Sequence, residues 1–113
     1  MNIYARHVST SEAGDYYGAS FALEKDGDET SPYLIIQRQF EDDDGGVCYI
    51  ETHDENYRGH FRLRRSDFSR TQFRIVIDRA HDNILCVNYR LSESTYAQAA
   101  KIVRIITGET DPP

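Results

Sequence analysis

The densest group of side chains that could do chemistry is His53-Asp54-Glu55, followed shortly by His60. Imidazole and carboxylate groups serve as zinc ligands and as general acids or bases, so these residues are candidates for a metal site or an acid–base site. The helical zinc patterns HExxH and HxxEH are both missing. A solvated turn accounts for the same residues, and we therefore expect no metal and no cofactor.

A second candidate is the acidic run Glu41-Asp42-Asp43-Asp44, which is followed by two glycines. A calcium loop counted from Asp42 needs glycine at its sixth position and glutamate at its twelfth, where this chain has Val47 and His53. The run is instead typical of a solvated hairpin tip. Its carboxylates would form a negative projection that could enter a basic cleft on a partner.

Motifs of common catalytic and phosphate-binding sites are also missing. The chain has no GxSxG, no GxGxxG and no GxxxxGK[ST], and neither Cys48 nor Cys86 stands in a recognisable nucleophile motif. Carboxylates such as Glu51 and Asp54 would need burial and mutual approach to act in acid–base catalysis. We therefore expect no catalytic residues and no enzyme activity. A bound metal or a cleft of perturbed carboxylates would reverse that expectation.

Arginines on two adjacent predicted strands form another candidate site. Arg62, Arg64 and Arg74 fall on the polar side of those strands, where guanidinium groups could bind phosphate or carboxylate. The alternative is cross-strand pairing with Glu51 and Asp78 on the same sheet face. We favour the pairing.

Charge is segregated along the chain. Residues 1–57 hold thirteen acidic against three basic residues, whereas residues 58–79 hold seven arginines against two aspartates. Such a division bears on partners and association rate rather than on the fold. The formal net charge of −6 argues against nucleic acid as a partner, because nucleic-acid-binding domains normally present a basic face.

Size and composition predict a single globular domain that spans residues 1–113. The 113 residues include 39% hydrophobic and 28% charged side chains, which is close to globular averages. No apolar run reaches the length of a membrane span, and the N-terminus lacks the apolar core of a signal peptide. We therefore expect a cytoplasmic protein without a membrane partner. Cys48 and Cys86 are read as reduced thiols, with a chance disulfide left open if their strands are neighbours.

The expected fold class is α+β, with an antiparallel meander sheet of about five to six strands. Short turns join β-rich runs at 19–23, 33–40, 47–52, 60–64, 72–78 and 84–91. Residues 2–7 could add an edge strand, and residues 9–18 and 24–32 have loop composition. In the run 60–64, Phe61 and Leu63 alternate with arginines, which predicts one buried and one wet face.

One C-terminal helix is expected to pack on the apolar face of the sheet. Ser92 is a suitable N-cap, and Gly108 a suitable terminator. Ile105 falls outside the apolar stripe, either as part of a frayed end or as a contact point for a partner. Five residues at helical spacing form that stripe, namely Tyr96, Ala99, Ala100, Val103 and Ile106.

The order of these pieces resembles the immunity protein 10 family of bacterial polymorphic toxin systems. The likeness rests on Tyr33 to Arg38, on Tyr49-Ile50-Glu51 leading through Asp54 to Gly59, on the two alternating strands that follow, and on Ile84 to Leu91 before a short terminal helix. Ala5-Arg6-His7-Val8 and Phe21-Ala22 before an acidic loop fit the same layout. The resemblance covers nearly the whole chain.

The resemblance implies a cytoplasmic antidote that binds one cognate toxin domain and blocks it without catalysis. An acidic surface would steer it toward a basic toxin cleft, with tyrosines as anchors. The expected toxin-binding residues are Asp42, Asp43, Asp44, Tyr49, Glu51, Asp54, Glu55 and Tyr57.

Two alternatives stay open at this point. The same fold would suit a small regulatory or chaperone-like protein-binding module unrelated to toxins. Exposed strand edges could also pair two copies into a homodimer, although arginines could equally blunt those edges.

Overall fold

The computed structural model describes residues 1–25, 30–40 and 45–112. These residues form eight strands, a short 3-10 helix and one α-helix. The elements in chain order are β1 (Asn2–Tyr4), β2 (His7–Ala13), β3 (Tyr16–Ala22), β4 (Tyr33–Gln39), β5 (Val47–Thr52), η1 (Glu55–Tyr57), β6 (Gly59–Phe68), β7 (Gln72–Ile77), β8 (Ile84–Asn88) and α1 (Glu93–Ile106).

All eight strands belong to one sheet, in the order β1-β8-β7-β6-β5-β4-β3-β2. Each strand from β2 to β8 pairs antiparallel with the next, which confirms the predicted meander. β1 adds a parallel edge, with Asn2 opposite Cys86 on β8. The sheet therefore has more strands than the expected five to six.

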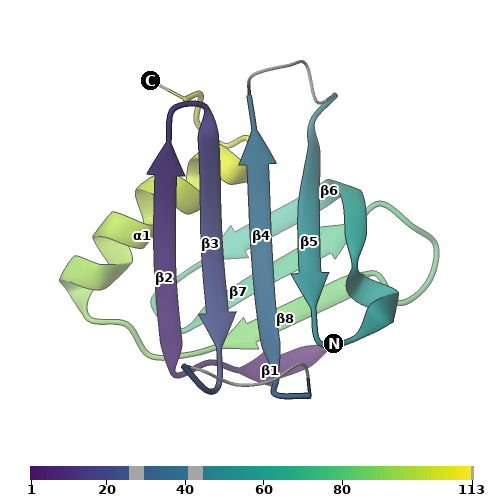
Figure 1. Cartoon of the computed structure of the whole chain (residues 1–113), viewed down its shortest axis with the longest axis horizontal. Coiled ribbons are helices and arrows are strands. Elements are labelled where there is room, and N and C mark those ends of the chain that lie inside the picture. The colour runs from purple at the N-terminus through teal and green to yellow at the C-terminus, as the bar shows by residue number, and fades with distance from the viewer. Residues whose placement is uncertain (26–29, 41–44, 113) are drawn as a thin grey trace.

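The sheet folds over on itself at β6. Gly59 to Arg62 pair with β5, while Leu63 to Phe68 pair with β7, and the register shifts between Leu63 and Arg65. Such a bulge bends a strand and increases its twist. As a result β2 to β5 form a front layer, and β6 to β8 cross behind it beside α1 (Figure 1).

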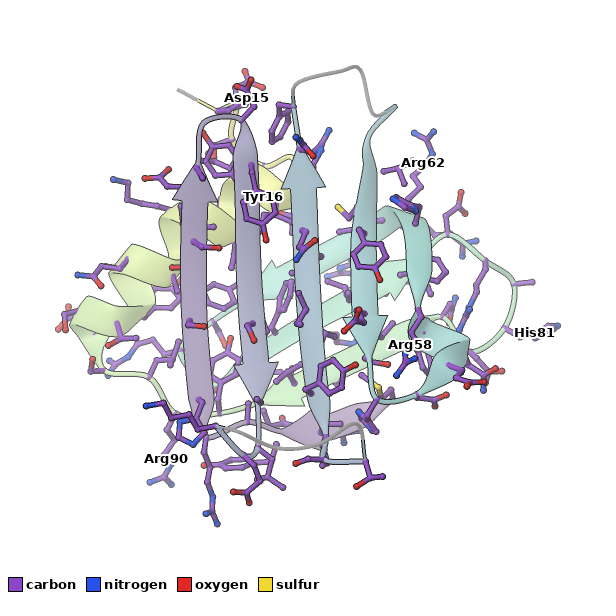
Figure 2. All side chains as sticks on the ribbon, viewed as in Figure 1. Asp15, Tyr16, Arg58, Arg62, His81 and Arg90 are labelled. Carbon is purple, nitrogen blue, oxygen red and sulfur yellow. The ribbon has the colours of Figure 1, made fainter. Side chains whose placement is uncertain are left out.

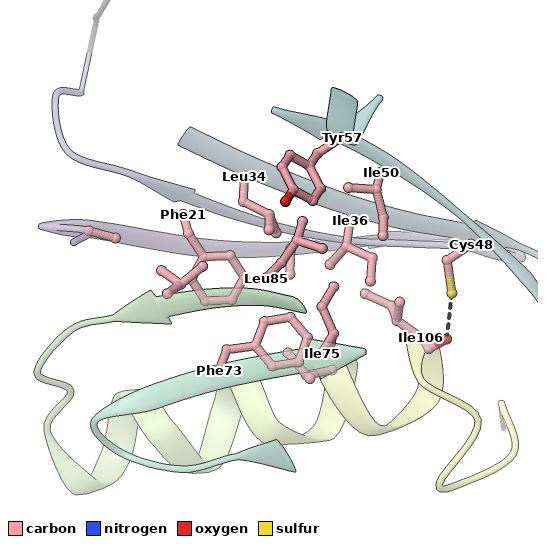
Figure 3. Packing of buried hydrophobic residues seen from close by; sticks show 14 of the residues in the cluster. Phe21, Leu34, Ile36, Cys48, Ile50, Tyr57, Phe73, Ile75, Leu85 and Ile106 are labelled. Atoms are coloured by element: carbon pink, nitrogen blue, oxygen red, sulfur yellow. Dashed lines mark hydrogen bonds between the residues drawn. The ribbon is translucent and has the colours of Figure 1, made fainter. Parts of the chain in front are cut away.

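The core lies between the two layers. The front layer contributes Phe21, Leu34, Ile36 and Ile50, all fully buried. The back layer supplies Phe73, Ile75, Leu85 and Val87, and α1 adds Val103 and Ile106 (Figure 3). Phe21 stacks on Phe73 across the layers with ring centroids 5.4 Å apart.

The helix forms as the sequence predicts. Ser92 Oγ accepts a hydrogen bond from Thr95 N at 3.2 Å, and Gly108 takes a φ of 81° beyond the last turn. Ile105 differs from the expectation, because only 8% of it is exposed. It lines a groove between α1 and β2, so a second side of the helix is covered.

The largest correction concerns residues 9–18, which form a hairpin and not a loop. β2 and β3 pair continuously from His7 opposite Ala22 to Ala13 opposite Tyr16. Gly14, with a φ of 62°, makes the two-residue turn possible. β2 carries polar residues on both faces, so no apolar alternation marks it as a strand.

The two cysteines lie on strands that are not neighbours, Cys48 on β5 and Cys86 on β8, and neither forms a disulfide. The buried Cys48 thiol donates to the carbonyl oxygen of Ile106 at 3.3 Å (Figure 3). This contact joins the end of α1 to the front layer.

Candidate functional site

The outer side of the front layer carries a group of aromatic side chains that we call the tyrosine face. It consists of Tyr16 on β3, Tyr33 on β4, Tyr49 on β5 and His60 on β6, with Glu51 among them. Strand register places them on one side, because residues directly opposite in a sheet share a face. Tyr49 is paired with both Gln37 and His60, and Gln37 is paired with Gly18, two positions from Tyr16.

Glu51 is the polar centre of the tyrosine face. The Tyr33 hydroxyl donates to Glu51 Oε2 at 3.1 Å, and the Tyr49 hydroxyl donates to Glu51 Oε1 at 3.2 Å. Both oxygens of one carboxylate are thus held by phenols. Such bonds fix the tyrosine rotamers, so the surface is ordered before any partner arrives.

These contacts shift the tyrosine pKa values. The hydrogen bond to Glu51 is the main reason that the pKa of Tyr49 lies above its usual 10.0, with desolvation second. For Tyr33 the order is reversed, because burial raises its pKa most and the bond to Glu51 comes next. Arg58 acts in the opposite direction on both phenols. Both side chains are therefore neutral hydrogen-bonding groups at physiological pH.

The upper part of the tyrosine face contains a shallow hollow of about 250 Å³. Tyr49 and His60 border it, with ring centroids 5.2 Å apart. Tyr16 lies across Gly18, where an added Cβ would be 2.6 Å from the tyrosine hydroxyl oxygen (Figure 2). Glycine at this position therefore lets an aromatic ring lie flat on the sheet. The complete lining is Tyr16, Gln37, Arg38, Gln39, Val47, Tyr49 and His60.

Asp54 and Glu55 lie beyond the end of β5, next to the tyrosine face. Asp54 caps η1, because its Oδ1 accepts from Asn56 N at 3.0 Å. Glu55 is exposed in the first turn of η1. Arg58 Nε donates to the Thr52 carbonyl oxygen at 2.7 Å, which brings a positive charge to the same corner. Of the two acids, Glu55 is the more accessible.

Tyr57 requires a correction, because it is a core residue with only 7% exposure and not a surface anchor. Its ring is covered by the Arg79 guanidinium, which lies 4.9 Å from the ring centroid. Its hydroxyl accepts a hydrogen bond from the N-terminal amine of Met1 at 3.4 Å. The chain turns inward at η1, so that Tyr57 joins the buried core. The sequence does not reveal this turn.

The structure brings together only some of the residues expected to bind a toxin. Tyr49 and Glu51 lie side by side, and Asp54 and Glu55 follow on the same strand end. Asp42, Asp43 and Asp44 lie outside the described residues. The sequence analysis did not place Tyr16 or Tyr33 in the site, and it raised His60 only as a metal or acid–base candidate. Alternation along 33–37 could have placed Tyr33 on the face opposite to that of the buried Leu34 and Ile36.

The seven arginines of residues 58–79 are divided between the two layers. Arg62 pairs with Val47 of the front layer, whereas Arg74 stands opposite Asp67 at the back. Arg64 forms the expected ion pair with Asp78, at 3.0 Å. Arg65 pairs with Asp67 at 3.2 Å. Glu51 was expected to pair with an arginine across the strands, but its carboxylate accepts hydrogen bonds from the two tyrosine hydroxyls.

Within 1–25, 30–40 and 45–112, no three His, Cys, Asp or Glu side chains come close enough to hold a metal ion. In the same ranges no helix has both the length and the apolar character needed to cross a membrane.

Comparison with known proteins adds no relative. No protein-family model matches the chain, and neither a curated protein nor a solved structure is a significant match.

Proposed function

We propose that this protein is an immunity protein that binds a cognate bacterial toxin domain and blocks it by occupying its surface. The tyrosine face, with Glu51 held between Tyr33 and Tyr49, is the observation that carries the proposal. The resemblance of the chain to the immunity protein 10 family gives the partner its class. The activity proposed is binding, with no catalytic step, and it would be exercised in the cytoplasm.

The tyrosine face has the composition of a protein-binding surface. Tyrosine offers a large contact area with few rotatable bonds, and it is enriched among residues that dominate binding energy. Gln37 and Gln39 of β4 add amides that can both donate and accept hydrogen bonds. The hollow beside Tyr49 and His60 would receive one protruding side chain of the toxin. Tyr33 takes the anchor role that the sequence gave to Tyr57.

Acidic residues would supply electrostatic steering. Glu51, Asp54 and Glu55 belong to one strand end and its 3-10 turn. Asp42, Asp43 and Asp44 lie in the segment between β4 and β5, the two strands that carry Tyr33 and Tyr49. A basic toxin cleft would be attracted by these charges, and the attraction would weaken with added salt.

Growth rescue tests the proposal directly. The first step is to look for a gene of a large secreted protein beside the gene of this chain. The C-terminal domain of such a protein would be expressed in a sensitive strain with or without the chain. We expect wild type to restore growth and the Tyr33→Ala/Tyr49→Ala double variant to lose protection. Loss of two anchors would weaken binding about a thousandfold, at about 2 kcal/mol each.

Tyr4→Ala is the matched control, because Tyr4 is 50% exposed on β1, away from the tyrosine face. It should protect as well as wild type. Circular dichroism would check that each variant folds. Failure of wild type to protect, or equal protection by the double variant, would contradict the proposal. Binding to a non-toxic protein through the same tyrosines would favour the regulatory-module alternative.

The two acidic groups can be tested separately with the purified complex. We expect alanine replacement of Asp42, Asp43 and Asp44 to slow association while leaving dissociation nearly unchanged, because charges that only steer act on encounter. Replacement of Glu51, Asp54 and Glu55 should slow association and also speed dissociation, because Glu51 holds the hydroxyls of the anchors Tyr33 and Tyr49. Surface plasmon resonance at low and high salt would measure both rates. If the on-rate stays the same in both sets, steering by acids is wrong. The sets are Asp42, Asp43 and Asp44, and Glu51, Asp54 and Glu55.

A further inference from the structure

The open edge of the sheet at β2 points to a second interaction surface. β2 ends the strand order, and among the described strands it pairs with β3 alone (Figure 1). It is seven residues long, has an unbroken register and contains neither proline nor lysine. Proteins usually protect such edges with short strands, bulges, proline or charge. The opposite edge follows that rule, since β1 has three residues.

The hairpin turn determines which backbone groups of β2 are available. A two-residue turn at Gly14-Asp15 closes on the hydrogen-bonded pair Ala13 and Tyr16. Because bonded and non-bonded pairs alternate in an antiparallel ladder, Val8, Thr10 and Glu12 direct their N–H and C=O groups away from β3. These groups form a regular row on the open edge.

The distribution of charge along β2 is complementary to that of a second, antiparallel β2. His7 begins β2 and Arg6 precedes it, whereas Glu12 lies near its end and Asp15 follows in the turn. In an antiparallel arrangement, the basic end of one copy meets the acidic end of the other. A parallel arrangement would place like charges together. Self-complementarity of this kind is what a two-fold axis requires.

We propose that β2 pairs antiparallel with β2 of a second copy, joining two sheets across a two-fold axis. The register that places Ser9 opposite Ser9 also places Val8 opposite Thr10 and brings Glu12 near Arg6, which precedes the first residue of β2. Val8 and Thr10 then exchange backbone hydrogen bonds from the row that faces the open edge. This assembly is independent of the proposed toxin binding.

A groove beneath the edge would receive side chains from the second copy. It lies between β2 and α1, has a volume of about 630 Å³ and includes Thr10 and Glu12. Ile102 and Ile105 of α1 provide apolar lining. Val8, Thr10 and Glu12 share the inner side of the sheet, because they stand opposite the buried Phe21, Ala19 and Tyr17. The same residues of an added β2 would therefore face α1.

Sedimentation of the full chain, combined with hydrogen exchange, tests this assembly. We expect a concentration-dependent species of twice the 13.0 kDa chain mass. The amides of Val8, Thr10 and Glu12 should exchange more slowly in it than in the monomer. Thr10→Pro should give a folded monomer, because this proline removes a donor only from the open edge. A wild-type chain that stays monomeric would overturn the proposal and leave the edge for an extended segment of another protein.

Reversing the charges at the two ends of β2 tests the dimer without relying on the proline variant. Glu12→Lys should weaken dimerisation about tenfold, since the symmetric interface contains the changed pair twice. Adding Arg6→Glu to Glu12→Lys should restore it. Glu24→Lys makes the same change of charge at an exposed position outside β2 and should have no effect. A dimer that is indifferent to Glu12→Lys, or that the double variant does not restore, would show that another surface is used.

Discussion

At the scale of single residues, the arrangement around Glu51 explains how a half-buried tyrosine surface can be ordered. Tyr33 and Tyr49 approach one carboxylate from neighbouring strands, and each satisfies one of its oxygens. A charged acceptor binds a phenol more strongly than a neutral one does. The order of the tyrosine face therefore depends on the charge of Glu51 as well as on its shape.

Replacement of Glu51 by glutamine should lower the pKa of both tyrosines, and at Tyr49 it removes the main cause of the raised pKa. The bond to Glu51 is the first cause of the Tyr49 shift, whereas burial comes first for Tyr33. Tyrosinate absorbance or ring NMR shifts over an alkaline titration would measure the change. Glu12→Gln, an exposed acid on β2, is the control. Unchanged Tyr49 ionisation would contradict the hydrogen bond.

The same shifts predict how stability depends on pH. A tyrosine whose pKa is raised by folding stabilises the protein fully below its unfolded pKa of 10.0, and that contribution is lost as pH rises through the raised value. Burial raises the pKa of Tyr89 in the core as well. Urea unfolding should therefore show a loss of stability above about pH 10, smaller in Glu51→Gln than in wild type. An equal loss in both would contradict the contribution of Glu51.

Gly18 offers a way to move one tyrosine without removing it. In Gly18→Ala the new methyl would meet the Tyr16 hydroxyl, at 2.6 Å, so the ring must shift off the strand. We expect a change in stability of less than about 1 kcal/mol, because Gly18 lacks a positive φ and the obstacle is a flexible side-chain end. Tyr16 ring resonances should shift. Unshifted resonances would contradict the close approach.

Gly14→Ala is the informative contrast to Gly18→Ala. An added Cβ at Gly14 has open space, with nothing within 4 Å, but the φ of 62° strains an L residue. This variant should lose about 1 kcal/mol of unfolding free energy and leave the Tyr16 resonances in place.

At the scale of elements, the sequence predicts those strands and that helix whose apolar residues follow a clear period. The runs around Leu34 and Ile36 and around Phe73 and Ile75 alternate buried with half-buried residues, as expected. β2 and the extension of β6 to Phe68 were missed. β2 has no apolar face, and the bulge after Leu63 changes the phase of β6.

In the candidate site, too, the residues on a regularly alternating strand could be predicted and the others could not. Tyr49 and Glu51 could be placed from the alternation of β5, and both lie on the tyrosine face. Tyr16 and His60 join that face only through pairing between strands, which composition cannot reveal. Tyr57 was misplaced because the chain turns inward at η1.

The capped start of α1 gives a prediction at this scale. Ser92→Ala removes the side chain that accepts from Thr95 N at 3.2 Å, so it should cost about 1 kcal/mol of unfolding free energy. Urea denaturation monitored by circular dichroism would measure it. Gln98→Ala, at an exposed position inside the helix, should be neutral or slightly stabilising. Equal effects of the two variants would argue against the cap.

At the scale of the whole molecule, the folded-over sheet places both layers around one core. The front layer cannot bury Phe21 and Leu34 without the back layer, and the back layer cannot bury Phe73 and Leu85 without the front. Small domains with a shared core usually unfold in one step. We therefore expect residues 1–113 to behave as one cooperative domain, with identical transitions for fluorescence and circular dichroism.

Substitutions at Phe21 and Phe73 can measure how much the contact between the two layers contributes to the free energy of unfolding. Their rings stack at 5.4 Å with 27° between planes, one from β3 and the other from β7. Phe21→Leu and Phe73→Leu should each destabilise the fold, and the double variant should lose less than their sum by about 1 kcal/mol, because either change alone already removes the ring pair. Ile50→Val with Phe73→Leu provides a comparison without an aromatic pair. Full additivity of the two Leu variants would mean that the layers are stabilised separately, with no direct contribution from this stack.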